Sequence, residues 1–183
     1  MHNKQKCVSL NCDCPSVQDC QSSITVCFNG VSFQIIAEGP FDNGRTWLYK
    51  VRRLAGAELS HFNVQFCVDA TVTQWQIFVF DPALNQCTEL LASGTGPNRN
   101  FEILPNGDPA SDCFADIPNL KFDNLSDFED ITDDFCFQFT LDQCYQTACI
   151  CVGTKAGPND GCACILGPSP DCAPCLPARG FRI

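Results

Sequence analysis

Apolar and polar residues alternate along most of the middle of this chain. The alternation is clear in residues 24–28, 47–51, 62–66, 75–79 and 135–141. Successive side chains of a β-strand point to opposite faces of a sheet, so this period indicates strands with one buried face. No segment repeats its apolar residues at the spacing of an amphipathic helix. The chain is therefore predicted to be all-β.

Turn signals separate these runs. Asn29-Gly30, Asn43-Gly44 and Asn106-Gly107 are dipeptides typical of tight hairpin turns. Short alternating runs at this spacing predict an antiparallel β-sandwich, jelly-roll-like, of about nine or ten strands over residues 23–168. The flanks differ in composition: residues 1–22 read as a cysteine-rich connector tail, and residues 169–183 as a Pro/Cys-rich tail.

Cysteine is far more abundant than such a domain needs. The 183 residues include 16 cysteines. A domain of this length buries about 70% of its unfolded surface and can fold without cross-links. One disulfide adds about 2–4 kcal/mol, against the 5–15 kcal/mol that stabilises a typical domain. The surplus favours exceptional durability, covalent links to other chains, or metal binding.

Charge and hydropathy narrow the choice of partners. The formal net charge is −10, whereas nucleic acids and anionic membranes attract basic patches. No apolar run approaches the 18 or so residues of a membrane span. We therefore expect neither nucleic-acid binding nor membrane insertion.

Disulfide-dense proteins belong to oxidising surroundings outside the cell. The first residues, MHNKQKCVSLNCDC, contain no apolar stretch of the kind found in secretory signals. We expect an extracellular location, at a cell or spore surface, reached either through a secretory signal that has been removed or by another route such as lysis of the producing cell.

Nine cysteines are candidates for disulfides between subunits. Three of them, at positions 27, 67 and 136, occupy the polar side of their own strands, where they could bridge neighbouring strands or reach a tail that crosses the sheet. The others lie in the two tails. The full set is Cys7, Cys12, Cys14, Cys20, Cys27, Cys67, Cys136, Cys172 and Cys175.

The stretch CICVGTKAGPNDGCAC, residues 149–164, has a Cys-x-Cys pair on each side of a turn-rich centre. An antiparallel hairpin symmetrical about that centre would pair Cys149 with Cys164 and Cys151 with Cys162. All four would share one face within disulfide range. The alternative is that each pair presents two thiols to a neighbouring subunit.

Metal binding is a weaker possibility. Structural zinc sites use paired Cys-x₂₋₄-Cys knuckles, or cysteine with histidine. This chain has one Cys-x-x-Cys, Cys172 to Cys175, and only two histidines. The acidic run 123–134 could offer oxygens to calcium, but its spacing differs from an EF-hand loop. We expect a solvated acidic loop there and no cofactor.

Catalysis has little support in the sequence. His61 follows Ser60, but adjacent strand residues face opposite sides of a sheet, so the two cannot act together. We expect His61 to be a hydrogen-bonded structural residue at the start of a strand, and the protein not to be an enzyme.

Several phrases together carry a family resemblance. They are TWLYKVRRLAGAELSHF (46–62), NLKFDN (119–124), FCFQFTLDQCY (135–145), VGTKAGPNDG (152–161) and ILGP (165–168). They resemble a poorly characterised extracellular β-domain of bacteria, which implies a secreted or surface β-sandwich without known catalysis. The cysteine-rich tails are similar in design to subunits of bacterial endospore appendages. There, a flexible N-terminal tail forms disulfides with preceding subunits in a fibre of jelly-roll domains.

Two functions follow from these features. The first is a structural subunit of a disulfide-crosslinked extracellular fibre or spore-surface appendage, a covalent homopolymer linked through the N-terminal cysteines. The alternative is a monomeric secreted module, stapled by intrachain disulfides, that binds carbohydrate or a surface partner. A thiolate metal binder is a third and weaker possibility.

Overall fold

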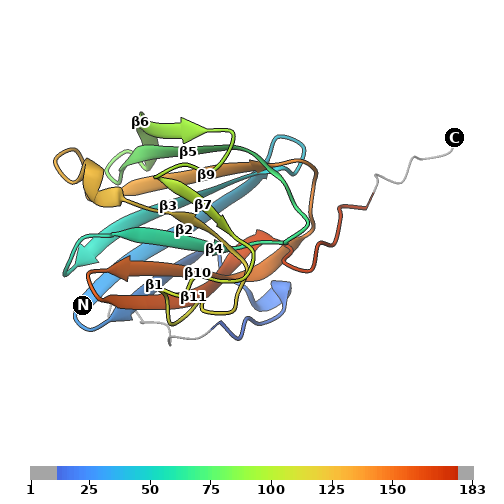
Figure 1. Cartoon of the computed structure of the whole chain (residues 1–183), viewed down its shortest axis with the longest axis horizontal. Coiled ribbons are helices and arrows are strands. Elements are labelled where there is room, and N and C mark those ends of the chain that lie inside the picture. The colour runs from blue at the N-terminus through green and yellow to red at the C-terminus, as the bar shows by residue number, and fades with distance from the viewer. Residues whose placement is uncertain (1–11, 177–183) are drawn as a thin grey trace, which may run out of the picture.

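The computed structural model describes residues 12–176, and its strands form two antiparallel sheets (Figure 1). In spatial order, the first sheet contains β1 (Ser23–Phe28), β2 (Val31–Phe41), β3 (Thr46–Ala55), β9 (Phe135–Leu141), β5 (Val72–Asp81) and β6 (Gln86–Gly94). The second contains β11 (Asn159–Pro168), β10 (Thr147–Ala156), β4 (His61–Gln65), β8 (Asn119–Phe122) and β7 (Phe101–Leu104). Two short 3₁₀ helices, η1 (Val17–Asp19) and η2 (Leu125–Phe128), complete the secondary structure of these residues.

The prediction of an antiparallel β-sandwich is confirmed, with eleven strands in residues 12–176 instead of nine or ten. The difference arises where alternation is weak. β6 has no buried residue on either face, and β7 and β8 are only four residues long. Such strands are fixed by pairing with their neighbours, so a period of two along the sequence does not reveal them.

The first hairpin follows the predicted turn chemistry. Asn29 and Gly30 join β1 to β2 and have φ values of 45° and 79°. Positive φ at both central residues matches the twist of the flanking strands, and Asn-Gly tolerates it better than other pairs. The turn sets the register, which places Val26 opposite Phe33 with both side chains in the core.

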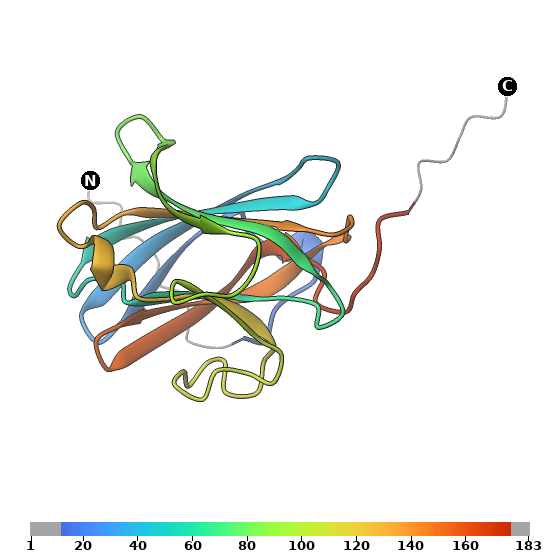
Figure 2. The same cartoon turned by 45° about the horizontal axis from the view of Figure 1, so that its top comes forward.

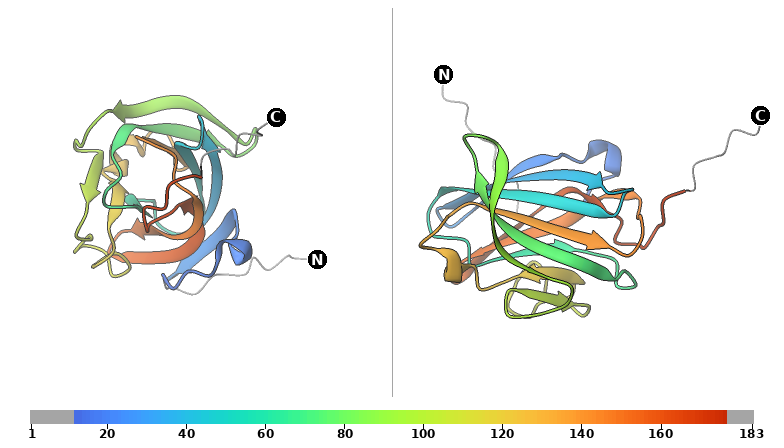
Figure 3. Two further views of the ribbon diagram at one scale, coloured as in Figure 1. Left: turned by 90° about the vertical axis from the view of Figure 1, so that its right-hand side faces the viewer. Right: turned by 90° about the horizontal axis from the view of Figure 1, so that it is seen from above.

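Aromatic side chains fill the space between the two sheets. Phe62 of β4 stacks on Phe137 of β9 with ring centroids 4.8 Å apart. Trp75 of β5 stacks on Phe101 of β7 at 5.2 Å. These rings are fully buried, and such pairs add about 0.5–1.5 kcal/mol each to the hydrophobic term. The end-on view shows the two layers closing around this core (Figure 3, left).

One buried hydroxyl ties the two sheets together through a polar contact. Tyr49 of β3 is fully buried, and its hydroxyl donates to the carbonyl of Leu166 in β11 at 3.0 Å. Burial raises the pKa of the Tyr49 phenol well above its ordinary value. The group therefore remains a protonated donor at neutral pH.

Replacing Tyr49 with phenylalanine is expected to lower the free energy of unfolding by about 1 kcal/mol, because the Leu166 carbonyl loses its donor inside the sandwich. Urea unfolding of both forms would measure the difference. Tyr145→Phe is a matched control, since the Tyr145 hydroxyl bonds to the exposed side chain of Asp142. Equal losses in the two variants would contradict a special role for the contact between the sheets.

The outer face of the second sheet is covered by two segments that lie outside the sheets. One is the N-terminal segment, residues 12–22, and the other is the β7–β8 loop, residues 105–118. Figure 2 shows the loop, in yellow-green, projecting beyond the sheet. Figure 3 shows the N-terminal segment, in blue, on the outside of the sandwich. Within residues 12–176, no helix has the length and apolarity needed to cross a bilayer.

Candidate functional site

The N-terminal segment is held on the β10–β11 hairpin by three disulfides. Cys20 bonds to Cys149, Cys14 to Cys164, and Cys12 to Cys151. The hairpin cysteines share the outer face of the sheet because they alternate with buried residues such as Ile150 and Ala163. A segment of eleven residues is thus fixed at three points along its length.

Other contacts of the N-terminal segment are few. None of its residues is buried, and its three cysteines are half-buried. Its described backbone hydrogen bonds to the sheets run from the Leu166 amide to the Gln21 carbonyl, 3.1 Å, and from the Ala37 amide of β2 to the Ser22 carbonyl, 2.8 Å. A pocket of about 200 Å³ remains beneath it, lined by residues of the segment and by Ile24, Cys149 and Cys164. Covalent bonds, more than packing, hold this segment in place.

The β7–β8 loop covers the neighbouring part of the same face. Phe114 is fully buried against Gly153 of β10, where a Cβ atom would stand 2.7 Å from the ring. Glycine at 153 therefore lets the loop approach the sheet. The Cys113–Cys162 disulfide fixes this contact, and Asp160 of β11 accepts hydrogen bonds from the Ser111 hydroxyl and the Asp112 amide.

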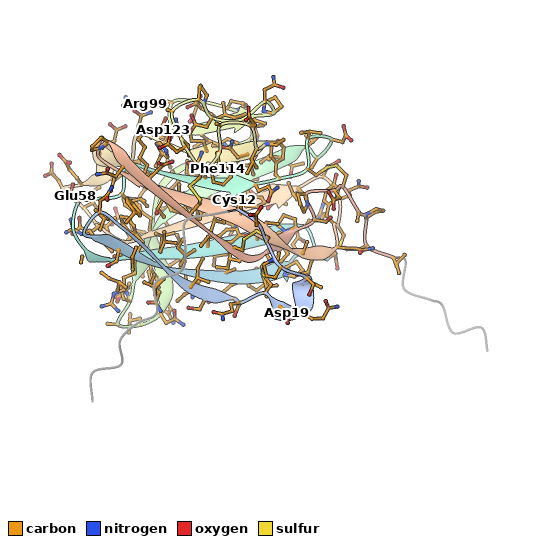
Figure 4. All side chains as sticks on the ribbon, turned by 90° about the horizontal axis from the view of Figure 1, so that it is seen from below. Cys12, Asp19, Glu58, Arg99, Phe114 and Asp123 are labelled. Atoms are coloured by element: carbon orange, nitrogen blue, oxygen red, sulfur yellow. A yellow bond between two sulfur atoms is a disulfide. The ribbon has the colours of Figure 1, made fainter. Side chains whose placement is uncertain are left out.

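The two covering segments meet at a cluster of sulfur atoms. The sulfurs of Cys12, Cys151 and Cys162 all lie within 4.8 Å of one another, although they belong to two different disulfides. Phe114 packs beside them. Figure 4 shows Cys12 and Phe114 close together on this face.

A buried ion cluster anchors the other side of the β7–β8 loop. Lys121 of β8 has its ammonium 3.4 Å from Asp108, 3.2 Å from Asp123 and 3.9 Å from Glu102. Asp108 lies in the loop and is almost completely buried. It also accepts hydrogen bonds from the Ala110 amide and the Asn63 side chain. Burial alone would lower the pKa of Lys121, but the three carboxylates outweigh it and raise that pKa.

His61 lies beside this cluster at the start of β4. It is 5% exposed. Burial, followed by the charge of Lys121, lowers its pKa to about 4, against the opposing effect of Asp123 and Asp108. The prediction of a structural residue at a strand start fits this position, but in residues 12–176 the Nε2 atom has no hydrogen-bond partner. Because its pKa is about 4, the imidazole is neutral at ordinary pH.

The sequence did not single out Lys121 and Asp108. Lys121 belongs to a strand of four residues, and Asp108 reaches it from a loop with no regular pattern. The feature of the sequence that could have indicated this buried cluster is the polar side of the neighbouring strand β4. His61 and Asn63 alternate there with apolar residues, and both are buried by the loop above them.

The structure places seven of the nine predicted intersubunit cysteines in described disulfides within the chain. The described pairs outside the hairpin are Cys67–Cys172, Cys87–Cys136 and Cys144–Cys175. Cys27 is also disulfide-bonded, and Cys7 lies outside the described residues. The idea that an outward cysteine reaches a tail fits Cys67, whose partner is in the C-terminal tail.

Two of these cysteines are not as accessible as their register suggested. Cys136 is completely buried because the β5–β6 hairpin folds over it and supplies Cys87. Cys67 lies beyond the end of β4 and is also buried. The register of a strand identifies a face of the sheet, but it does not reveal what covers that face.

The predicted pairing inside the hairpin is wrong, although the hairpin exists. Its turn is at Gly157-Pro158, so Cys151 lies opposite Cys164 and Gly153 lies opposite Cys162. Gly157 has a φ of 59°, which a tight two-residue turn needs and which proline could not supply. All four cysteines instead bond to residues outside the hairpin, on the two covering segments.

Two groups of described residues bring three potential metal ligands together. One is the sulfur cluster, and the other consists of Cys67, Asp69 and Cys172. Their cysteines are all in disulfides, whereas the thiolate is the form that binds metal. A metal would therefore require these bonds to be reduced. Several carboxylates of the acidic loop have cationic partners: Arg53 contacts Asp133, and Arg99 contacts Asp127.

Comparison of this chain with models of known protein families, with curated proteins and with solved structures finds no match. The candidate site is therefore interpreted from its own geometry. Seven disulfides between described residues fit an extracellular protein that is stabilised by disulfides.

Proposed function

We propose that this chain is a structural subunit of a disulfide-crosslinked extracellular assembly. The N-terminal segment of one copy would dock on another copy, on the face formed by its β10–β11 hairpin and its β7–β8 loop, and bond to cysteines there. One observation carries the proposal: an exposed segment with no buried side chain is attached to one hairpin by three disulfides. The intrachain form is then the closed state of a connector that can also bridge two copies.

Three bonds exceed what the stability of a monomer requires. A disulfide acts mainly by closing a loop in the unfolded chain, and its effect grows with the length of that loop. Cys20–Cys149 closes a loop with a sequence separation of 129. Once it has formed, Cys14–Cys164 and Cys12–Cys151 close only short additional loops. Their contribution to folding is smaller, whereas a joint between subunits gains strength from every bond.

The surface at this joint suits a docked segment. Cys149 and Cys164 are half-buried and line the pocket beneath the segment, so a second chain can reach both sulfurs. The similarity in design to subunits of bacterial endospore appendages supports the same arrangement, and it suggests a cell or spore surface as the location.

A denaturing gel, with thiols blocked before lysis and no reductant, tests the proposal on protein from its natural source. We expect a ladder of multiples of the chain that collapses to the monomer when reductant is added. In a variant with Cys12, Cys14 and Cys20 replaced by serine, the ladder should disappear. The Cys87→Ser/Cys136→Ser variant is the matched control, since it loses one disulfide elsewhere and should keep the ladder.

The alternative function is a monomeric extracellular binding module. It is favoured by the observation that all seven described disulfides close within one chain. A single monomer band with and without reductant would support it and overturn the covalent assembly. Persistence of the ladder in the triple serine variant would also overturn the role of the N-terminal segment.

A further inference from the structure

We propose that Cys12, Cys113, Cys151 and Cys162 form a disulfide-exchange site whose substrate is a cysteine thiol. The identity of that thiol rests on the proposed function. If the chain does form a covalent assembly, the thiol is Cys113 of another copy. Attack on one disulfide of the site would then rearrange the other, so that cross-linking passes from copy to copy without an oxidant.

The proximity of the sulfurs is the first observation. The Cys12–Cys151 and Cys113–Cys162 disulfides lie side by side, with the sulfurs of Cys151 and Cys162 within 4.8 Å although they are not bonded. Disulfides rearrange when a thiolate attacks a neighbouring disulfide sulfur. In the part of the chain that the structure describes, no other group brings three cysteine sulfurs this close.

The unequal exposure of the four residues is the second observation. Cys12 and Cys113 are half-buried and belong to the two covering segments, whereas Cys151 and Cys162 are at most 2% exposed and belong to the hairpin. An incoming thiol therefore reaches Cys12 more easily than Cys151. The Cys151 thiolate released by that attack would be buried beside Phe114, where a charge is poorly solvated. This favours its onward reaction.

The exchange proceeds in two balanced steps. The incoming thiolate attacks the Cys12 sulfur, a new disulfide forms there, and Cys151 leaves as a thiolate. The Cys151 thiolate then attacks the Cys162 sulfur, Cys151–Cys162 forms, and Cys113 leaves as a thiolate. One thiol is consumed and one is produced, and the number of disulfides is unchanged. The products are an N-terminal segment bonded to the incoming thiol, a disulfide across the hairpin and a reactive Cys113.

Position makes the released Cys113 suitable for a further round. Its neighbours Asp112, Ala115 and Asp116 on the β7–β8 loop are exposed, so its thiolate can meet Cys12 of a further copy. Each round would add one copy and regenerate one thiolate. A single thiol could thus start a chain of links.

The experiment uses the full, oxidised chain and limiting reduced glutathione as the probe. After quenching with N-ethylmaleimide, peptide mapping by mass spectrometry would locate each product. We expect glutathione on Cys12, alkylation of Cys113 and a Cys151–Cys162 cross-link, in equal amounts. Alkylated Cys151 together with an intact Cys113–Cys162 bond would overturn the inference, and so would a reaction confined to other disulfides.

A Cys113→Ser/Cys162→Ser variant provides the matched control, because it keeps Cys12–Cys151 but removes the second disulfide. With glutathione it should accumulate alkylated Cys151. If it gave no alkylated Cys151 while the parent chain reacted as expected, the assigned order of steps would be wrong. The readout does not depend on polymerisation. Exchange without a gel ladder would leave this inference standing and overturn the covalent assembly. A ladder in which Cys113–Cys162 stays intact would support the covalent assembly and overturn this inference.

Discussion

Replacing Lys121 with methionine is expected to lower the free energy of unfolding by about 3–5 kcal/mol, the typical cost of breaking a buried ion pair by removing one partner. The ammonium of Lys121 lies near three carboxylates, of which Asp108 is the most deeply buried. Without it, Asp108 keeps two hydrogen-bond donors, from Ala110 and Asn63, but its buried negative charge loses the ammonium 3.4 Å away.

The same substitution should show a characteristic dependence on pH. Burial by itself raises the pKa of Asp108, but the Ala110 amide and Lys121 outweigh it and hold that pKa below its ordinary value. Loss of Lys121 lets the pKa rise, so the carboxyl takes up a proton at a higher pH in the variant. The difference in stability between the two proteins should therefore shrink as the pH falls through the acidic range.

Urea unfolding across that range would measure both effects. Arg99→Met is a suitable control, because Arg99 pairs with Asp127 on the surface and its side chain is 68% exposed. Such a pair contributes about 0–1 kcal/mol. The assignment would be wrong if Lys121→Met cost no more than Arg99→Met.

Acidification between about pH 6.5 and pH 4 is expected to destabilise the protein by about 3 kcal/mol through His61 alone. Burial lowers the pKa of His61 from 6.5 to about 4, and each unit of such a shift corresponds to about 1.4 kcal/mol. Above pH 6.5 the imidazole is neutral in both states. Below it the unfolded chain takes up a proton that the folded protein excludes, so stability falls with the pH down to about 4.

The variant His61→Gln removes this titration. Its unfolding free energy should change less steeply in the same window, by up to about 1.4 kcal/mol per pH unit. The slope is the informative quantity, since the substitution also alters packing and shifts the whole curve. Identical slopes for the two proteins would show that His61 does not titrate as its burial requires.

The sheets of this protein were largely predictable from local pattern. The disulfides that hold the covering segments on the second sheet were not. Alternation in residues 47–51 and 135–141 identified β3 and β9, because each strand has one face in the core. The position of the turn at Gly157-Pro158 decided the register of the β10–β11 hairpin, and nothing in the symmetry of its cysteines revealed that position.

The candidate site depends on contacts between distant parts of the chain. Cys12 and Cys151 are 139 residues apart, and Cys14 and Cys164 are 150 apart. Sixteen cysteines allow too many pairings for spacing to select one. Likewise, the burial of Lys121 depends on a loop that folds back over its strand, held by Phe114 and Cys113.

The positions of the outermost described cross-links determine how the molecule would carry tension. Suppose that one end is pulled through Cys12 and the other through Cys175. Force passes across Cys12–Cys151, along the backbone from residue 151 back to residue 144, and out through Cys144–Cys175. The rest of the sandwich lies outside this covalent path. A stretched subunit would therefore extend very little until a sulfur–sulfur bond broke.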